Sequence, residues 1–205
     1  MRTSHAPEVR GFSFGKSALA GGVGLLLCAL SPSGARTDSL PPDLLEPAAE
    51  RSKPSFTLPD TAGTQRALAD IGTRVVLVHF WATWCEPCRV ELSSLSQLVD
   101  RNPDVTVMAI NVAEPPVRVR RFLEANPVTF SVLLDENRAV TRAWGVAVLP
   151  TTYVLDRSLT IHRVAERDID WLKPEVVTVL KDVGNASSSV TDNNTQQGEK
   201  RHGNQ

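Results

Sequence analysis

Two cysteines separated by two residues are the groups in this sequence best suited to covalent chemistry. Cys85 and Cys88 enclose Glu86 and Pro87. Their sulfurs can close a small disulfide ring or open to a dithiol, so the pair can exchange two electrons with a thiol or disulfide partner. A disulfide that closes so short a loop stabilises a fold little, which weakens the interpretation of a purely structural bridge. Haem attachment is excluded because Arg89, not His, follows the second cysteine.

A metal site is the main alternative use of two thiolates. The chain has only three cysteines, too few for a disulfide-stapled scaffold or a four-cysteine zinc site. Further ligands would have to come from His79, His162 or His202. None of these stands at ligand spacing from the cysteines, although folding could bring one close. The sequence therefore predicts a redox pair with no metal and no other cofactor.

The charge composition narrows the class of partner. The chain has 22 Lys and Arg residues against 23 Asp and Glu residues, a net charge of −1. This balance gives no electrostatic reason to expect nucleic acid as a partner. We expect protein thiols and disulfides as substrates, and a monomer.

Residues 1–35 have the pattern of a secretory signal. Basic residues precede an uncharged, largely apolar run from Ser17 to Ala35, and Ser33 and Ala35 are the small residues of a cleavage site. An uncleaved membrane anchor is the alternative, because the run approaches the roughly 20 residues that span a bilayer. In both cases the rest of the chain is predicted to be exported, to the periplasm or another extracytoplasmic compartment. Cleavage would also remove Cys28.

The elements that would position the cysteines are a buried strand and the helix after it. The apolar run Val75–Phe80 predicts a strand buried on both faces, and a helix pattern extends from about Glu86 to Asp100. At the start of a helix, unpaired N–H groups and the helix dipole stabilise a thiolate. This context predicts that Cys85 is the exposed nucleophile and that Cys88 is the partly buried resolving thiol.

The remaining patterns predict an α/β domain over residues 53–183. Strands are expected at 56–58, 105–112, 130–134, 152–155 and 160–164, and helices at 117–125, 136–144 and 174–183. The tight turn between the last two strands implies an antiparallel pair, hence a mixed sheet between layers of helices. Residues 36–52 are expected to be a linker and residues 184–205 a disordered tail, because neither carries a sustained apolar pattern.

Four segments together resemble the exported TlpA/ResA-like branch of the thioredoxin-fold thiol–disulfide oxidoreductases. They are Phe56–Asp70, Phe80–Cys88, Val107–Val112 and Leu149–Asp156, in the family's order. The resemblance implies a thioredoxin-like fold, a central mixed sheet flanked by helices with an added N-terminal β-hairpin. It also implies an enzyme that reduces protein disulfides, as in apocytochrome c or copper-site assembly proteins. A membrane electron donor would re-reduce it.

The resemblance assigns roles to three residues around the cysteines. Pro150 would follow a cis peptide bond and expose backbone to a substrate strand; the alternative is an ordinary proline at a strand start. Glu91, one helical turn after Cys88, matches an acid that accepts a thiol proton; the alternative is a solvated glutamate. Trp84 would shield the site or only pack beside it.

Three further residues influence the proposed chemistry. His79 stands where thioredoxin has a buried aspartate and this branch often an asparagine. A buried histidine would be neutral, and we interpret it as a hydrogen-bonded core residue rather than a proton relay to Cys88. Glu86 places a negative charge beside Cys85, which disfavours the thiolate and so indicates a reductant. Pro87 suits the first turn of the helix.

Two other classes of function are also compatible with the sequence. A copper-delivery protein of thioredoxin-like fold would bind metal through Cys85, Cys88 and a histidine, although such proteins usually have three residues between the cysteines. A thiol peroxidase shares the Phe56–Asp60 segment, but this sequence lacks the single-cysteine loop of those enzymes.

Overall fold

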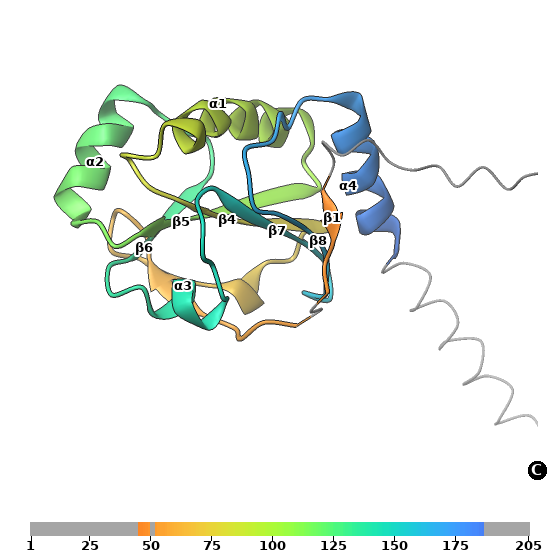
Figure 1. Cartoon of the computed structure of the whole chain (residues 1–205), viewed down its shortest axis with the longest axis horizontal. Coiled ribbons are helices and arrows are strands. Elements are labelled where there is room, and N and C mark those ends of the chain that lie inside the picture. Colours follow the sequence, from red (N-terminus) through yellow and green to blue (C-terminus); the bar gives the residue numbers. More distant parts are fainter. Residues whose placement is uncertain (1–44, 50–51, 187–205) are drawn as a thin grey trace, which may run out of the picture. The chain divides into compact units, whose positions relative to one another are not determined.

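The computed structural model of the chain describes residues 45–49 and 52–186 (Figure 1). The predicted signal or anchor, most of the predicted linker and the chain beyond Ala186 lie outside these residues. Within the described part, no helix is long and apolar enough to cross a membrane.

A six-stranded mixed sheet forms the centre of the domain, with strand order β1-β8-β7-β4-β5-β6. Its strands are β1 (Glu46–Pro47), β4 (Val75–Trp81), β5 (Val105–Val112), β6 (Ser131–Asp135), β7 (Thr151–Asp156) and β8 (Ile161–Ala165). Strands β4, β5 and β6 are parallel, whereas β7 is antiparallel to both β4 and β8. The predicted mixed sheet is therefore confirmed.

Helices cover one face of the sheet, and a helix with a hairpin covers the other (Figure 1). The first layer contains α1 (Glu86–Arg101), α2 (Pro116–Ala125) and α4 (Pro174–Ala186); the second contains α3 (Ala139–Ala143), the hairpin β2 (Thr57–Pro59) and β3 (Gln65–Ala67), and a 3-10 turn at Leu68–Asp70. The hairpin forms a sheet of its own, which confirms that prediction.

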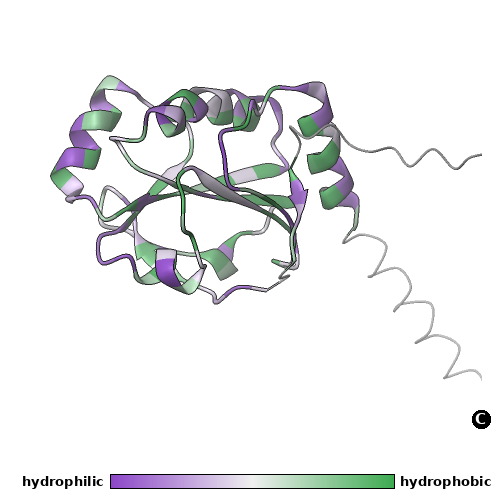
Figure 2. Cartoon of the chain, viewed as in Figure 1, coloured by the Kyte–Doolittle hydropathy of each residue, from purple (hydrophilic) through white to green (hydrophobic). Residues whose placement is uncertain are grey.

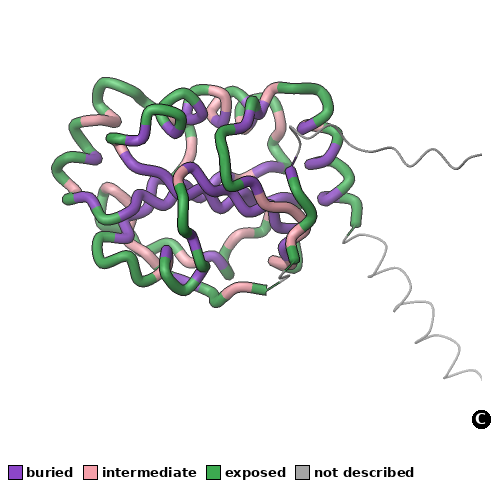
Figure 3. The backbone as a smooth tube through the Cα atoms, viewed as in Figure 1, coloured by how far each residue is buried: buried purple, intermediate pink, exposed green. Residues whose placement is uncertain are grey.

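Strand β4 is buried along its whole length because both layers pack on it (Figure 3). Leu77 and Trp81 point into the layer of α1, and Val78 and Phe80 into the layer of α3. A strand with two apolar faces reads in sequence as a continuous apolar run. Figure 2 shows this concentration of hydrophobic residues in the central strands.

Trp144 anchors the loop that leads from α3 to β7. Its ring lies 5.7 Å from that of Phe56, 5.8 Å from that of Phe80 and 5.2 Å from that of Tyr153. Its Nε1 donates to the carbonyl of Pro54 at 3.0 Å, and its carbonyl accepts from the Tyr153 hydroxyl at 2.9 Å. Buried aromatic groups with satisfied polar atoms hold this loop, and with it Pro150, in one position.

The helix predicted at 136–144 is shorter than expected, since α3 covers only Ala139–Ala143. The buried carboxylate of Asp135 accepts from the backbone N–H of Val140 at 3.3 Å and of Thr141 at 2.7 Å. These bonds supply the first helical N–H groups with a side-chain acceptor, and Arg138 before them is left-handed, with φ 60°. The helix consequently starts three residues later than the periodicity predicted.

Both ends of the domain also differ from the prediction. Glu46 and Pro47, inside the predicted linker, form β1 and pair with β8, and Leu45 before them is buried. The linker prediction is thus wrong for this part, because a two-residue edge strand has no period to detect. Helix α4 continues to Ala186, three residues into the predicted tail.

We expect Asp135→Ala to lower the free energy of unfolding by about 1–3 kcal/mol, because it leaves buried N–H groups and the Thr141 hydroxyl without an acceptor. Thr141→Ser keeps the hydroxyl that bonds Asp135 and serves as the matched control. Urea denaturation measures both variants. A loss no larger for Asp135→Ala than for Thr141→Ser would show that the carboxylate does not stabilise α3.

Candidate active site

The cysteine pair lies where β4 meets α1, as the sequence predicted. Cys85 is the N-cap of α1, and its sulfur accepts from the Cys88 backbone N–H at 3.3 Å. The two residues form a disulfide with a Cα–Cα distance of 5.3 Å. Cys85 is 5% exposed and Cys88 is fully buried. Cys85 is therefore the more accessible of the two residues but is less exposed than predicted, since it packs within the hydrophobic core around α1.

The charge that the sequence places beside Cys85 is balanced in the fold. Arg89 Nη1 lies 2.7 Å from Glu86 Oε2, and both side chains are exposed. A nearby cation offsets the effect of a carboxylate on a neighbouring thiolate. Glu86 therefore disfavours a thiolate at Cys85 less than its own charge would suggest.

Pro150 stands beside the end of the strand that precedes the cysteines. The Leu149–Pro150 peptide bond is cis. The next residue, Thr151, pairs with Phe80 of β4, and its hydroxyl donates to the Val148 carbonyl at 2.8 Å. This register brings the segment before Pro150 to the edge of the sheet at which the cysteines lie.

Glu91 is a buried acid and not a solvated one. It is 2% exposed, and its Oε1 accepts from the Ile169 backbone N–H and from Trp171 Nε1, both at 2.8 Å. Burial raises the pKa of Glu91 from 4.5 to about 7, and the charge of Asp168 adds to the rise. Its Oε2 is buried and has no hydrogen-bond partner within the described residues, so no other group of this part of the chain occupies the oxygen on which a proton could sit.

His79 lies on the same face of β4 as Leu77 and Trp81, because residues two apart in a strand share a face. Its side chain therefore points into the layer between β4 and α1. Its Nδ1 is 2.9 Å from the Thr152 hydroxyl, and its buried Nε2 has no partner among the described residues. Burial lowers the pKa of His79 from 6.5 to about 3, because an imidazolium would lose its hydration. The side chain is therefore neutral at physiological pH.

The sequence did not point to the residues that hold Glu91, nor to the residue that holds the turn before Cys85. Ile169 and Trp171, the partners of Glu91, lie in the loop before α4. Their only signal in the sequence is that they are apolar residues within a polar stretch.

Glu114, 4% exposed, accepts from the Thr83 backbone at 2.6 Å, from the Thr83 hydroxyl at 2.5 Å and from Asn111 Nδ2 at 2.8 Å. This carboxylate fixes the turn two residues before Cys85.

A groove of about 250 Å³ opens beside the cysteines. Trp84 and Leu149, the neighbours of Cys85 and Pro150, line it together with Val148. Trp84 is 67% exposed and Val148 48%. Trp84 therefore does not pack into the core, and the groove presents an apolar surface to a partner.

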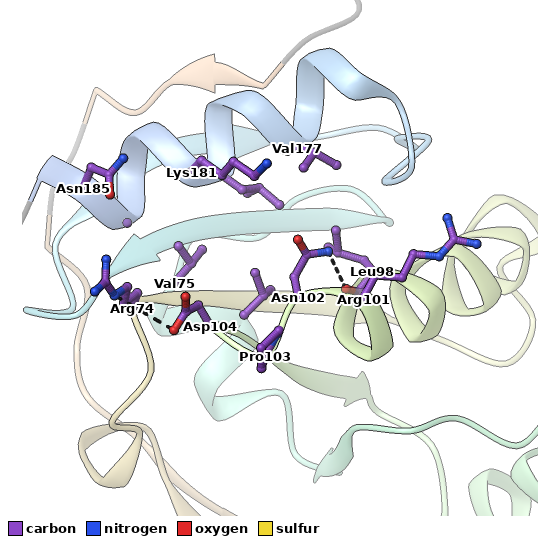
Figure 4. Close-up of a pocket in the computed structure, with 13 residues that line it drawn as sticks. Arg74, Val75, Leu98, Arg101, Asn102, Pro103, Asp104, Val177, Lys181 and Asn185 are labelled. Carbon is purple, nitrogen blue, oxygen red and sulfur yellow. Dashed lines mark hydrogen bonds and ion pairs between the residues drawn. The ribbon is translucent and has the colours of Figure 1, made fainter.

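A cavity of about 310 Å³ lies at the opposite end of β4, between α4 and the last turn of α1 (Figure 4). Its lining includes Val75, Leu98, Leu180 and the cations Arg74 and Lys181. It contains none of the predicted site residues and begins where β4 begins, whereas the cysteines follow the end of that strand.

The histidines do not gather around the cysteines. His162 Nε2 lies 2.9 Å from Asp156 Oδ2 near the turn between β7 and β8, and His202 lies outside the described residues. In the described ranges, no three His, Cys, Asp or Glu side chains are placed to hold one metal ion. The copper-binding arrangement considered from the sequence has no counterpart in this part of the chain.

Comparison with known proteins agrees with the fold and the cysteine pair. The sequence pattern of the AhpC/TSA family matches residues 50–164, more than half of the chain. The chain is 34% identical over 113 residues to the thiol-disulfide oxidoreductase ResA of Geobacillus thermodenitrificans and 31% identical over 132 residues to that of Geobacillus kaustophilus. These matches span 54% and 59% of this chain and 65% and 76% of the relatives.

A solved structure extends this similarity to the fold. The secreted thiol-disulfide isomerase of Corynebacterium glutamicum superposes with a TM-score of 0.60 at 25% identity, over 69% of this chain and 90% of the other. The predicted thioredoxin-like fold is confirmed.

Glu91 and His79 give the stability of the oxidised protein opposite pH dependences. The raised pKa of Glu91 favours the folded state below pH 4.5, and this contribution is lost as the pH rises towards about 7. The lowered pKa of His79 makes its contribution complete above pH 6.5, and this contribution is lost as the pH falls towards about 3. Between roughly pH 5 and 6.5 the two slopes oppose each other in the unsubstituted protein.

We expect Glu91→Gln to expose the His79 slope, so that the free energy of unfolding falls by about 2 kcal/mol from pH 6.5 to 5, at about 1.4 kcal/mol per pKa unit. His79→Asn should expose the Glu91 slope, with a fall of similar size from pH 5 to 6.5. Urea denaturation across this range measures both. Slopes of the same sign in the two variants would contradict the burial of these groups.

Proposed function

Because the chain belongs to the AhpC/TSA family, we propose that it is an exported thiol–disulfide oxidoreductase that reduces protein disulfides through Cys85 and Cys88. One observation carries the proposal: the pair forms a disulfide at the N-terminus of α1, with a buried acid one turn further along this helix and a cis-proline at the same end of β4. A helix start stabilises a thiolate, and an acid within one turn can hold the proton that a thiol releases.

In the proposed reaction, the dithiol reduces one substrate disulfide and ends as the disulfide seen in the structure. The Cys85 thiolate attacks a substrate sulfur, the substrate S–S bond breaks, and its other sulfur leaves as a thiolate. The Cys88 thiolate then attacks Cys85, which closes the Cys85–Cys88 bond and releases the second substrate thiol. Two electrons pass from the enzyme pair to the substrate, and each released thiolate takes up a proton.

Glu91 is proposed as the group that accepts the proton of Cys88 before the second step. A pKa of about 7 allows it to bind and release a proton at neutral pH. Its Oε1 is held by Ile169 and Trp171, so Oε2 remains for the transferred proton. The neutral His79 is proposed to remain a core residue, since its Nδ1 already bonds Thr152.

The proposed direction is reduction in an oxidising compartment. A buried carboxylate near Cys88 opposes a second negative charge, which destabilises the dithiol in its ionised form and favours electron donation. Substrates are proposed to be disulfides of exported proteins, such as apocytochrome c or copper-site assembly proteins. A membrane electron donor would return the pair to the dithiol, and the protein would act as a monomer.

We expect Cys88→Ala to accumulate mixed disulfides with exported proteins, because the resolving thiol is gone and Cys85 stays bound to its substrate. Non-reducing electrophoresis followed by mass spectrometry identifies them, and Cys85→Ala is the control that should capture nothing. Equal capture by the two variants would contradict the nucleophile assignment.

Equilibration of the unsubstituted protein with glutathione tests the direction of electron transfer. A reduction potential of about −120 mV, the strongly oxidising end of the known range, would exclude a reductase.

We expect Glu91→Gln to remove an inflection near pH 7 from the alkylation rate of reduced Cys85, and to raise that rate by up to about tenfold at pH 8, because no carboxylate then opposes the thiolate. Iodoacetamide labelling followed by mass spectrometry measures the profile. Glu86→Gln removes an exposed, ion-paired carboxylate of the same helix and is the matched control. An unchanged profile in Glu91→Gln would show that Glu91 does not exchange protons with the pair.

A further inference from the structure

The lining of the groove includes the chain neighbours of two active-site residues. Trp84 precedes Cys85, and Leu149 precedes Pro150. A substrate segment joined to Cys85 through its own cysteine would therefore have its neighbouring residues next to this groove. Exposed apolar side chains that form one contiguous surface mark a site for a partner, and Trp84 and Val148 are exposed side chains that line the same groove.

Arg138 is the one ionisable residue among the described residues that line the groove. It is exposed, and its guanidinium makes no hydrogen bond or ion pair within the described part of the chain. Asp135, whose chain neighbours include Arg138, and Glu114, next to the groove residue Ala113, are buried carboxylates that are already engaged, Asp135 by Thr141 and Glu114 by Thr83 and Asn111. Neither of them is free to neutralise Arg138.

The backbone that presents Arg138 is held in an uncommon conformation. Arg138 and Ala113 both have φ 60° and both line the groove. The left-handed region is disfavoured by about 1–2 kcal/mol per residue for side chains of this kind. The N–H groups of both residues donate to one acceptor, the Asp135 carbonyl, at 3.1 Å. Left-handed residues that the surrounding structure maintains occur preferentially at functional sites.

We propose that Arg138 selects substrate segments that carry a carboxylate close to the cysteine being reduced. The occupant of the groove is an extended, acidic segment of an exported protein, with apolar contacts to Trp84 and Val148 and an Asp or Glu side chain on the Arg138 guanidinium. Arginine suits this task because its planar fork binds a carboxylate with two hydrogen bonds. The inference rests on the proposed function, since it names the substrate class of that same site.

The test uses synthetic peptides with one cysteine joined to 2-thiopyridine, a neutral leaving group, and with Glu, Gln or Lys beside the cysteine. Each protein molecule, reduced beforehand, releases one thiopyridine as it becomes oxidised, and kcat/KM is obtained from the dependence of this single-turnover rate on peptide concentration. We expect the Glu peptide to exceed the Gln peptide by about 3- to 10-fold, mainly through KM, the range of one ion pair at a partly exposed site. Arg138→Gln should abolish this ratio, and Arg138→Glu should favour the Lys peptide.

Arg142→Gln is the matched control, because Arg142 is a neighbouring exposed arginine whose guanidinium bonds the Asn137 carbonyl and does not line the groove. It should keep the preference for the Glu peptide. Equal ratios for the unsubstituted protein and Arg138→Gln would overturn the inference and leave the proposed function intact. If none of the peptides is reduced, the proposed function fails and this inference fails with it. A change in sedimentation caused by Arg138→Gln, without a change in peptide preference, would assign the groove to a second copy of the chain and also overturn the inference.

Discussion

Burial of β4 on both faces is the constraint on which the rest of the structure depends. Because the strand supplies apolar side chains to both layers, it must be central, with a parallel neighbour on one side and an antiparallel one on the other. Its end is then the place where a helix can start over one face of the sheet. Cys85 lies at this helix start, and the antiparallel neighbour β7 brings Pro150 to the same end of β4.

The acid beside the cysteines shows how a distant loop changes the chemistry of a helix residue. On α1 alone, Glu91 would be an ordinary glutamate one turn beyond Cys88. The loop between β8 and α4 covers it with Ile169 and Trp171, which remove water and leave only two donors on one carboxylate oxygen. Desolvation exceeds the effect of these two bonds, so the net change is a higher pKa. This burial therefore gives Glu91 a pKa of about 7, close to neutral pH.

Asp135 holds the backbone that lines the groove, through both its carboxylate and its backbone carbonyl. Its carboxylate starts α3, and its carbonyl holds the left-handed residues Ala113 and Arg138. The chain can therefore leave β5 and β6 with sharp turns and still present a defined groove beside Trp84. Stability from a buried, fully bonded carboxylate offsets the cost of two uncommon backbone conformations, and the same bonds set the position from which Arg138 projects.

The sequence by itself determined the order of elements, the mixed sheet and the position of the cysteine pair. The spacing of apolar residues and the proline in the first helical turn are local properties of the sequence. A strand buried on both faces appears as a continuous apolar run, a pattern that no exposed element shares. The resemblance of whole segments to a known family also singled out Glu91 and Pro150 as candidate site residues. The short strand β1 and the late start of α3 were not predicted, because the pairing of an edge strand and the capping of a helix by a side chain depend on single contacts and not on periodicity.

Only the tertiary structure decided what surrounds these residues. The partners of Glu91 lie 78 and 80 residues away in sequence, and Thr83 is held by Glu114, 31 residues away. Arg89 balances Glu86, and Trp84 turns outwards to a groove that carries one cation. Burial, hydrogen bonding and charge pairing act through space between residues that are remote along the chain, so they are decided when the layers close on the sheet.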